Sequence, residues 1–537
     1  MIERLAVIRP EIALFIAACV VMLLGVSRNA GVRRLVWWVT GVSLVIAGWL
    51  AITTEGRVGL IPGLTPYVKT MVAVVGLLLV LVLAGSVDRG YERLVARGAA
   101  KFDPIRSTGG EFAAFFLFSL TGVMLCASAD DLIWLFLALE LTSLPTYVMV
   151  ALSTSRERSG ESAVKYFFLG AFGAAVFLYG FALLYGATGT TMLPEIAASF
   201  AEGRAGLLGI AGLTLALVGV AFKMAAAPMH FYAADVYEGS SAPVAAHLAF
   251  APKAAGLVSA MLLLACPGWS FGEGLPEAVR VVVWVMAAVT MTVGNAMALL
   301  QSSVKRMLAY SSVAHSGYML VGLVAGPVTA GSGASSIWTN GLSASLFYML
   351  CYGLMNVGAF AALAALERGH GADGETIELE TIDDLRGLCK ARPWVGWGFV
   401  LSALSLLGFP PLLGFFAKLF LFTSAISAGE IVLVVVMGLN SAVGAFYYLR
   451  LVSSAYFERD GAAAKARPTP LLGRALATAL SGASVVATLP FVWGLQRASV
   501  KAVQVDEGSV VRAAESLTKG KTAHGTTGAD TERASTN

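Results

Sequence analysis

The sequence is divided into apolar blocks of about 20 residues, and this division restricts the fold more than any other feature. About 20 apolar residues are what an α-helix needs to cross the ~30 Å hydrocarbon core of a bilayer. No helical period separates a polar face from an apolar one within the blocks, so each should be surrounded by lipid or other helices. Because lipid cannot satisfy backbone hydrogen bonds, the blocks predict an all-α polytopic membrane protein.

Block length and loop signals predict about fourteen spanning helices. We expect them near residues 11–26, 33–52, 68–87, 111–128, 131–152, 162–187, 205–227, 242–265, 278–300, 304–326, 341–366, 394–422, 430–457 and 471–495. The share of charged residues is only 13%, against about 25% in soluble domains. From residue 498 onward the sequence is polar and predicts a disordered tail.

The basic residues of the loops predict the orientation. Loops after odd-numbered blocks hold most of them, including Arg28, Arg33, Arg34, Arg89, Arg93, Lys305 and Arg306. Loops after even-numbered blocks offer little beyond Arg57, Lys69, Arg204 and Arg280. The positive-inside rule therefore places the odd loops in the cytoplasm and both termini outside, on the periplasmic side.

Five ionisable residues lie well inside the apolar blocks: Glu140, Lys223, Lys253, His315 and Lys418. A charge at the centre of a spanning helix costs ~2.5–3.5 kcal/mol on insertion scales, so these side chains should face the bundle interior, water or one another. Such residues usually mark an ion pathway. Lys165 lies near the start of its block, where it is either a secondary member of such a pathway or a solvated lysine.

Prolines accompany these residues. They are Pro145, Pro228, Pro252, Pro410 and Pro411. A proline inside a helix frees the carbonyl four residues earlier, so Pro228 should free the Met224 carbonyl beside Lys223 and Pro145 that of Leu141 beside Glu140. We therefore expect broken helices at all these prolines and a hydrated path along them.

Each residue also has a purely structural explanation. Glu140 and Lys223 can form a buried ion pair that only joins two helices. Lys253 and Lys418 can extend towards an interface, and His315 can be a hydrogen-bonded core histidine. The sequence alone leaves these alternatives open.

Two stretches of five blocks share one pattern, in which the fourth block of each carries a proline-broken helix and a lysine. Because five is an odd number, tandem copies would lie upside down relative to each other, as in the inverted repeats of transporters. We therefore predict N-terminal helices in 1–110, a first repeat in 111–265, a second in 278–457, a last helix in 471–495 and a polar tail in 498–537.

Motifs of soluble chemistry are missing from the sequence. The five cysteines are scattered without a CxxC pair, which argues against a zinc site or an iron–sulfur cluster. No Walker loop, GxSxG or HExxH motif is present. The net charge of +4 is small and argues against nucleic-acid binding. We expect no metal, cofactor or redox centre in this chain.

Three stretches together resemble the antiporter-like membrane subunits of proton-pumping NADH:quinone oxidoreductase, respiratory complex I. They are KMAAAPMHFYAADVYEGSSAPVAAHLAFAPKAAG (223–256), SSVKRMLAYSSVAHSGYMLVG (302–322) and LSLLGFPPLLGFFAKLFLF (404–422). The phrase DVYEG is the most specific, and the resemblance covers about residues 11–495. Lysine at position 418 is similar to the N-type subunits, where M-type subunits usually have glutamate. L-type subunits share the lysine but add a long C-terminal lateral helix, for which this sequence has no apolar segment.

The resemblance implies two inverted five-helix repeats in a multi-pass protein of the bacterial inner membrane. It implies a glutamate at Glu140, channel lysines at Lys223 and Lys253, a bridging histidine at His315 and an exit lysine at Lys418. It further implies that the chain is a non-redox subunit of a translocating enzyme. NAD, FMN, iron–sulfur clusters and quinone would then lie in partner subunits, with other membrane subunits, lipid and protons as partners.

From these residues we expect proton transfer from the cytoplasm to the outside, driven by quinone reduction in partner subunits. Burial disfavours the protonated form of Lys223 and the Glu140 carboxylate favours it. At an effective dielectric constant of about 20, two unit charges about 4 Å apart interact by about 4 kcal/mol, so a modest separation changes the balance. The alternatives are a subunit of a multisubunit sodium/proton antiporter or membrane-bound hydrogenase, a stand-alone transporter, and a structural membrane anchor.

Overall fold

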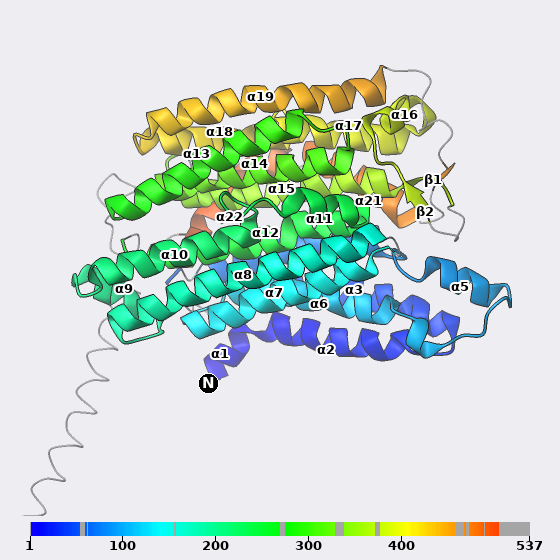
Figure 1. Cartoon of the computed structure of the whole chain (residues 1–537), viewed down its shortest axis with the longest axis horizontal. Helices are drawn as coiled ribbons and strands as arrows, with labels where there is room; N and C mark the ends of the chain where they lie inside the picture. The colour runs from blue at the N-terminus through cyan, green and yellow to red at the C-terminus, as the bar shows by residue number, and fades with distance from the viewer. Residues whose placement is uncertain are drawn as a thin grey trace, which may run out of the picture.

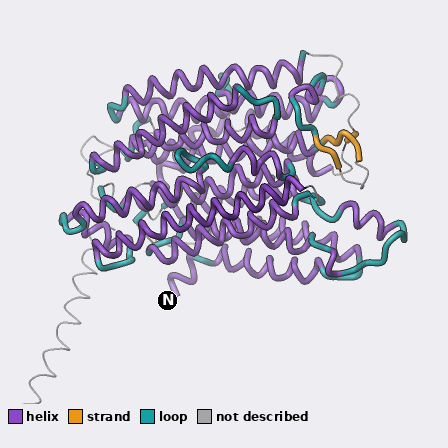
Figure 2. The backbone as a smooth tube through the Cα atoms, viewed as in Figure 1, coloured by secondary structure: helices purple, strands orange, loops and turns teal. Residues whose placement is uncertain are grey.

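Long helices running along one common axis make up almost the whole molecule (Figure 1), and Figure 2 shows how little strand or loop accompanies them. The computed structural model describes residues 2–53, 60–61, 63–154, 157–268, 274–327, 338–370, 376–457, 467–468, 472–487 and 489–503. Three short antiparallel strands, β1 (Leu366–His370), β2 (Thr376–Glu378) and β3 (Arg467–Pro468), form a small sheet in the order β2-β1-β3. The predicted all-α polytopic class is confirmed.

The helices of the N-terminal part and the first predicted repeat are α1 (Ile2–Val7), α2 (Arg9–Gly25), α3 (Ala30–Thr53), α4 (Leu64–Leu83), α5 (Arg89–Ala96), α6 (Gly109–Cys126), α7 (Leu132–Leu152), α8 (Glu157–Thr188), α9 (Leu193–Ala201), α10 (Gly206–Met224), α11 (Ala233–Gly239) and α12 (Ala242–Ala265). The remaining helices are α13 (Glu277–Leu299), α14 (Val304–Ala325), α15 (Gly341–Ala364), α16 (Leu388–Ala391), α17 (Pro393–Leu407), α18 (Leu413–Ser427), α19 (Ile431–Tyr456), α21 (Leu472–Ala487) and α22 (Val492–Val503). Short 3-10 turns are η1 (Pro104–Arg106), η3 (Ile382–Leu385) and η4 (Leu489–Phe491).

The number of membrane crossings agrees with the sequence. Among the described residues, eleven helices are long and apolar enough to span a bilayer. The shorter α2, the successive pair α17 and α18, and the pair α21 and α22 account for three more crossings, which completes the fourteen that we predicted. The bounds of α12 coincide with the predicted block at 242–265.

Two of the predicted helix breaks exist and two do not. The chain leaves the helix between α10 and α11, around Pro228, and between α17 and α18, around Pro410 and Pro411. Pro145 and Pro252 instead lie inside the continuous helices α7 and α12, so the breaks predicted there are wrong. A proline is tolerated inside a spanning helix where neighbouring helices and hydroxyl side chains surround the freed backbone.

The start and end of the chain also correct the sequence analysis. Helix α22 continues to Val503, so the polar tail does not begin at residue 498. Residues 504–537 lie outside the described residues, as does Arg57. Lys69, which we counted among the loop cations, lies inside α4 and is almost fully buried against Glu11 of α2.

The loops after odd-numbered crossings gather at one end of the bundle. Ser107, in the loop before α6, donates to the Gly25 carbonyl at the end of α2, and Lys305 donates to Ser240. The strands and α16 lie at this end, on the right of Figure 1, whereas the N-terminus and α9 lie at the left. Because Lys501 of α22 lies against Gly63 before α4, both described ends of the chain are opposite the basic loops. Which side faces the cytoplasm stays a prediction.

The five crossings of each predicted repeat follow the same order, and the fourth crossing is interrupted in both. Helix α6 starts at the end where the basic loops gather. Helix α13 starts at the other end, where Arg280 pairs with Glu430 just before α19. The two halves therefore run in opposite directions. The exact residue limits of the repeats stay a prediction.

Burial separates the helices into a core and a lipid-facing rim. In α12 and α14 every residue of the apolar window is buried, and in α15 94% are. In α3, α8 and α19 only 33% are buried, which fits helices that face lipid or neighbouring proteins. Close packing inside the bundle relies on small residues. A side chain at Gly180 of α8 would collide with the backbone of Gly212 and Ala216 in α10.

Candidate functional site

Glu140 and Lys223 form an ion pair in the bundle interior. Helix α7 carries Glu140 and α10 carries Lys223, and the Lys223 Nζ lies 3.1 Å from the Glu140 Oε1. The same Nζ donates to Ser143 Oγ at 2.7 Å. The rings of Phe177 and Phe222 lie 5.7 Å and 5.9 Å from the ammonium. The Lys223 side chain is 1% exposed and that of Glu140 is 17% exposed, so the pair lies in a medium that screens charges weakly.

The end of α10 supplies an acceptor to the next lysine. The helix ends at Met224, and Ala225 after it adopts a left-handed conformation with φ of 54°. The Met224 carbonyl, which we expected to be free because of Pro228, accepts a hydrogen bond from Lys253 Nζ at 3.1 Å. Backbone and lysine thus connect α10 directly to α12.

Lys253 has a complete set of acceptors. Besides the Met224 carbonyl, its Nζ donates to the Ser312 carbonyl at 2.7 Å and to Ser316 Oγ. Three acceptors match the three donors of an ammonium group. Ser312 and Ser316 flank His315 on α14, so Lys253 connects α12 to the helix of the histidine.

His315 lies between two tyrosines. Its Nδ1 is 2.6 Å from the Tyr348 hydroxyl of α15 and its Nε2 is 2.9 Å from the Tyr448 hydroxyl of α19. The Tyr448 hydroxyl also bonds Ser311 Oγ. Because hydroxyls can donate or accept, this arrangement accommodates either tautomer of the neutral ring. The ring can therefore take up a proton at one nitrogen and release one at the other.

Lys418 lies just after the second break. Its Nζ donates to the Leu407 carbonyl at 2.7 Å and lies 5.0 Å from the centre of the Tyr318 ring. Leu407 is four residues before Pro411, so this carbonyl too is one that a proline frees. Each of the two helix breaks thus places a backbone acceptor beside a buried lysine.

The structure therefore places in the bundle interior all five ionisable residues that the sequence singled out, four of them buried and Glu140 half-buried. We call Glu140, Lys223, Lys253, His315 and Lys418 the buried string. Lys253 bonds to Met224, the residue after Lys223, and to Ser312 near His315 on α14. Lys418 lies over the ring of Tyr318, whose centre is 5.7 Å from that of His315. Their role as a relay stays a proposal.

Lys165 lies apart from the buried string. It is 45% exposed at the start of α8 and pairs with Glu161 at 2.7 Å and Asp235 at 3.3 Å. Asp235 also pairs with Arg306 of α14 at 2.8 Å, and Glu238 pairs with the same arginine at 3.0 Å. The acids of the DVYEG phrase thus hold α11 against α14 and α8 at the basic end.

His247 is a buried histidine that we did not include in the predicted site. This residue is fully buried in α12, one and a half turns before Lys253, and its Nε2 lies 3.0 Å from Ser119 Oγ of α6. Its Nδ1 has no partner among the described residues. A single histidine near a lysine is ambiguous in sequence, which is why His247 was not included. Tyr348 and Tyr448 were missed because tyrosines in apolar blocks also occur as core residues.

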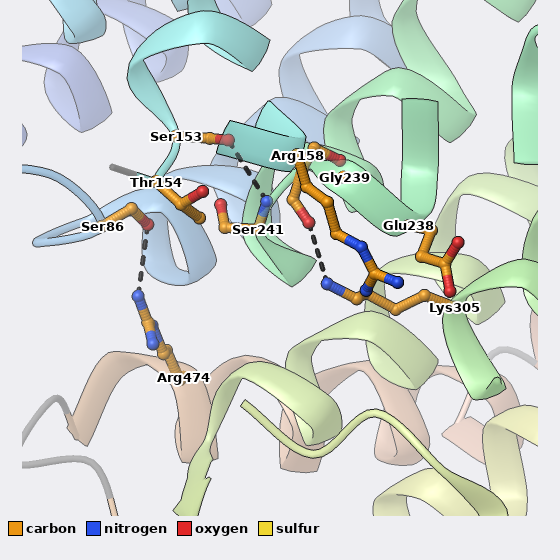
Figure 3. Close-up of a pocket in the computed structure, with 10 residues that line it drawn as sticks. Ser86, Ser153, Thr154, Arg158, Glu238, Gly239, Ser241, Lys305 and Arg474 are labelled. Carbon is orange, nitrogen blue, oxygen red and sulfur yellow. Dashed lines mark hydrogen bonds between the residues drawn. The ribbon is translucent and has the colours of Figure 1, made fainter. Parts of the chain in front are cut away.

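A small polar cavity of about 40 Å³ lies at the basic end, at the start of α12 (Figure 3). Lys305 donates to the Ser240 carbonyl at 2.9 Å on its wall. The hydroxyls of Thr154 and Ser241 are buried without a partner in the described part of the chain. Buried hydroxyls in a cavity large enough for a few water molecules are well suited to hold water.

Comparison with known proteins gives three concordant results. The family model described as NADH:quinone oxidoreductase/Mrp antiporter, TM matches residues 129–444, which contain the whole buried string. NADH-quinone oxidoreductase subunit N of Trichlorobacter lovleyi is 36% identical over 467 residues, which are 85% of this chain and 88% of that protein.

Solved structures extend the similarity to the fold. A chain of respiratory complex I from Thermus thermophilus with bound aureothin is 30% identical, with a TM-score of 0.69 over 91% of this chain and 98% of that chain. A chain of the archaeal membrane-bound sulfane sulfur reductase gives a TM-score of 0.75 over 95% of this chain and 99% of that one. It is 22% identical and shows the shared fold alone.

Proposed function

The chain belongs to the NADH:quinone oxidoreductase/Mrp antiporter family of membrane proteins, and from this membership we propose that it is a proton-translocating subunit of NADH:quinone oxidoreductase. The observation that supports this most directly is the buried string. Hydrogen bonds connect α7 to α10, α10 to α12 and α12 to α14 along the string, and Lys418 of α18 adjoins it at the Tyr318 ring, at the depth where charges are expensive. A membrane anchor would have no need of so many buried ionisable groups.

The hydrogen-bond partners indicate a direction of transfer. Lys253, with three acceptors, is arranged to hold a charged ammonium. Lys418 has one hydrogen-bond acceptor among the described residues and lies over the Tyr318 ring. We infer that protons rest on the Lys223 and Lys253 side and reach Lys418 through His315. Lys418 then releases them on the outer side, opposite the basic loops.

Separation of Glu140 and Lys223 would supply the driving step. At 3.1 Å and an effective dielectric constant of about 20, the pair interacts by about 5 kcal/mol, and at about 6 Å by roughly half of that. The difference corresponds to roughly a hundredfold change in proton occupancy. In this proposal the separation follows quinone reduction in partner subunits, which hold the NAD, FMN, iron–sulfur clusters and quinone. The polar cavity of Figure 3 is our candidate for the cytoplasmic mouth.

A substitution at Lys253, in the middle of the buried string, tests this proposal. We expect Lys253→Met to lower proton pumping by about tenfold or more, because the replacement keeps the volume but removes the proton-carrying group. The measurement is acidification of proteoliposomes that contain the whole complex, with the amount of assembled complex checked on native gels. Lys390→Ala is the matched control, because Lys390 is exposed on α16 at the basic end. Normal pumping by an assembled Lys253→Met complex would contradict the relay.

The same assay separates protons from sodium. We expect identical acidification with and without sodium, since the buried string consists of groups that titrate and lacks a cage of oxygen ligands. A sodium requirement would favour the antiporter alternative, which shares the family and the fold.

A further inference from the structure

A cavity of about 470 Å³ lies at the basic end of the N-terminal helices, between α2, α3, α5 and α6. It lies beside the start of the first predicted repeat, whose first helix is α6, and apart from the buried string. Its volume is in the range of sites that bind small organic ligands. Val36, Trp37, Val87 and Val95 give it an apolar wall.

Basic residues surround this cavity. Four arginines and two acids line it, which leaves an excess of two positive charges. These residues are Arg33, Arg34, Arg89, Arg93, Asp88 and Glu92. Both acids are engaged by protein groups. Glu92 forms a two-bond pair with Arg33 at 2.6 Å and 2.7 Å, and Asp88 accepts from the backbone N–H groups of Thr108 and Gly109 at 2.6 Å each.

Arg34 is available for a ligand. It is exposed and has no acidic partner among the described residues. Trp37 follows it by three positions on α3, so the indole lies on the same face of the helix, further into the bilayer. The cavity therefore offers a cation at the level of the lipid headgroups and apolar surface beside it.

The segment that closes the cavity has the composition of a membrane-surface segment. Leu94 of α5 is 49% exposed and Ile105 in η1 is 90% exposed. Both belong to the basic segment that connects α4 to α6. Exposed apolar side chains next to arginines are typical of segments that lie against anionic lipid. In Figure 1, α5 lies at the end of the bundle where the basic loops gather.

We propose that this cavity binds an anionic phospholipid from the leaflet on the basic side of the molecule. The phosphate lies on Arg34 and its neighbouring arginines, and the acyl chains pack against Val36 and Trp37. A basic pocket between spanning helices is the arrangement that recognises anionic headgroups. The apolar wall distinguishes such a lipid from free phosphate, which would leave that wall uncovered.

A photoactivatable phosphatidylglycerol analogue, added to the whole complex in membranes, tests the proposal. We expect crosslinks within the cavity residues, displaced by phosphatidylglycerol and not by phosphatidylcholine or inorganic phosphate. Arg34→Gln should weaken labelling about fivefold, since one cation near the surface is lost. Ala96→Trp should abolish labelling because it fills the cavity while every charge remains. Arg450→Gln, at an exposed arginine of α19, should leave labelling unchanged.

Four results would overturn the proposal. Equal displacement by phosphatidylcholine would show that the cavity does not recognise the negative charge of the headgroup. Displacement by inorganic phosphate would indicate a site for free anions. Crosslinks to a neighbouring subunit would show that protein covers the cavity. If Ala96→Trp prevents assembly, Ala30→Trp fills the other side of the same cavity, and undiminished labelling with that variant also refutes the site.

Discussion

Lys223→Ala should abolish most proton pumping while the complex still assembles. The alanine removes the only group that Glu140 pairs with among the described residues, together with the donor to Ser143. Since the buried string begins at this pair, no proton can then reach Lys253 from Glu140. We expect acidification and coupled quinone reduction to fall by about tenfold or more, the size of effect that loss of a positioned acid–base group has.

The measurement is acidification of proteoliposomes that contain the whole complex, normalised to assembled complex on native gels. Lys390→Ala is the control for loss of a lysine. Lys223→Ala can also prevent assembly, because a buried ion pair that loses one partner leaves an uncompensated charge. In that case Glu140→Gln/Lys223→Met, which removes both charges and nearly keeps the side-chain volumes, decides between the two roles. Normal pumping in that double variant would refute the relay.

The positions of the helices could be predicted because lipid leaves the backbone no alternative. A block of about 20 apolar residues has to be a helix in a bilayer, whatever its neighbours are. Residues that are typical of helix starts and ends then mark the helix limits. At α12, Ser241 at the N-cap and Pro243 in the first turn mark the start where it was predicted. The residues of the buried string could be predicted equally well, because a charged residue in an apolar block is energetically costly and is therefore rare unless it has a function.

Prediction failed where the outcome depended on packing. Pro411 interrupts its crossing beside Gly408, which adopts a φ of 88° that glycine accepts readily. Pro252 lies in α12, where every neighbour is another helix, and the helix continues through it. A local difference that we find is Gly408 close before Pro411, since a glycine at that place favours a break.

Lys69 illustrates the same limit at a helix end. The predicted block began at residue 68, which put Lys69 at the very start of the helix, and we counted it with the loop cations. Helix α4 instead begins at Leu64, and α1 covers its start, where the Val7 carbonyl accepts from Lys69 Nζ at 2.6 Å. Only the folded arrangement of α1, α2 and α4 shows that Glu11 lies 2.7 Å from Lys69.

Glu11→Leu should therefore destabilise the protein by about 3–5 kcal/mol without reducing pumping by each assembled complex. The substitution leaves the Lys69 ammonium 1% exposed and without its carboxylate partner. A buried charge that has lost its partner destabilises the folded state strongly. Removing both charges with Glu11→Leu/Lys69→Met should restore most of the stability, because two apolar side chains then fill the same volume. The measurements are the temperature at which half of the complex disassembles and the acidification per assembled complex.

The comparison between the two buried pairs is the sharper test of the proposed function. Glu11–Lys69 and Glu140–Lys223 have similar distances, 2.7 Å and 3.1 Å, and both lysines are 1% exposed. They differ in that only Lys223 continues, through Met224, to a second lysine. If the role of Glu140–Lys223 is proton transfer, an apolar pair there restores assembly but not pumping, whereas an apolar pair at positions 11 and 69 restores both. If the two double variants assemble and pump equally well, both pairs are structural and the proposed relay role of Glu140–Lys223 is wrong.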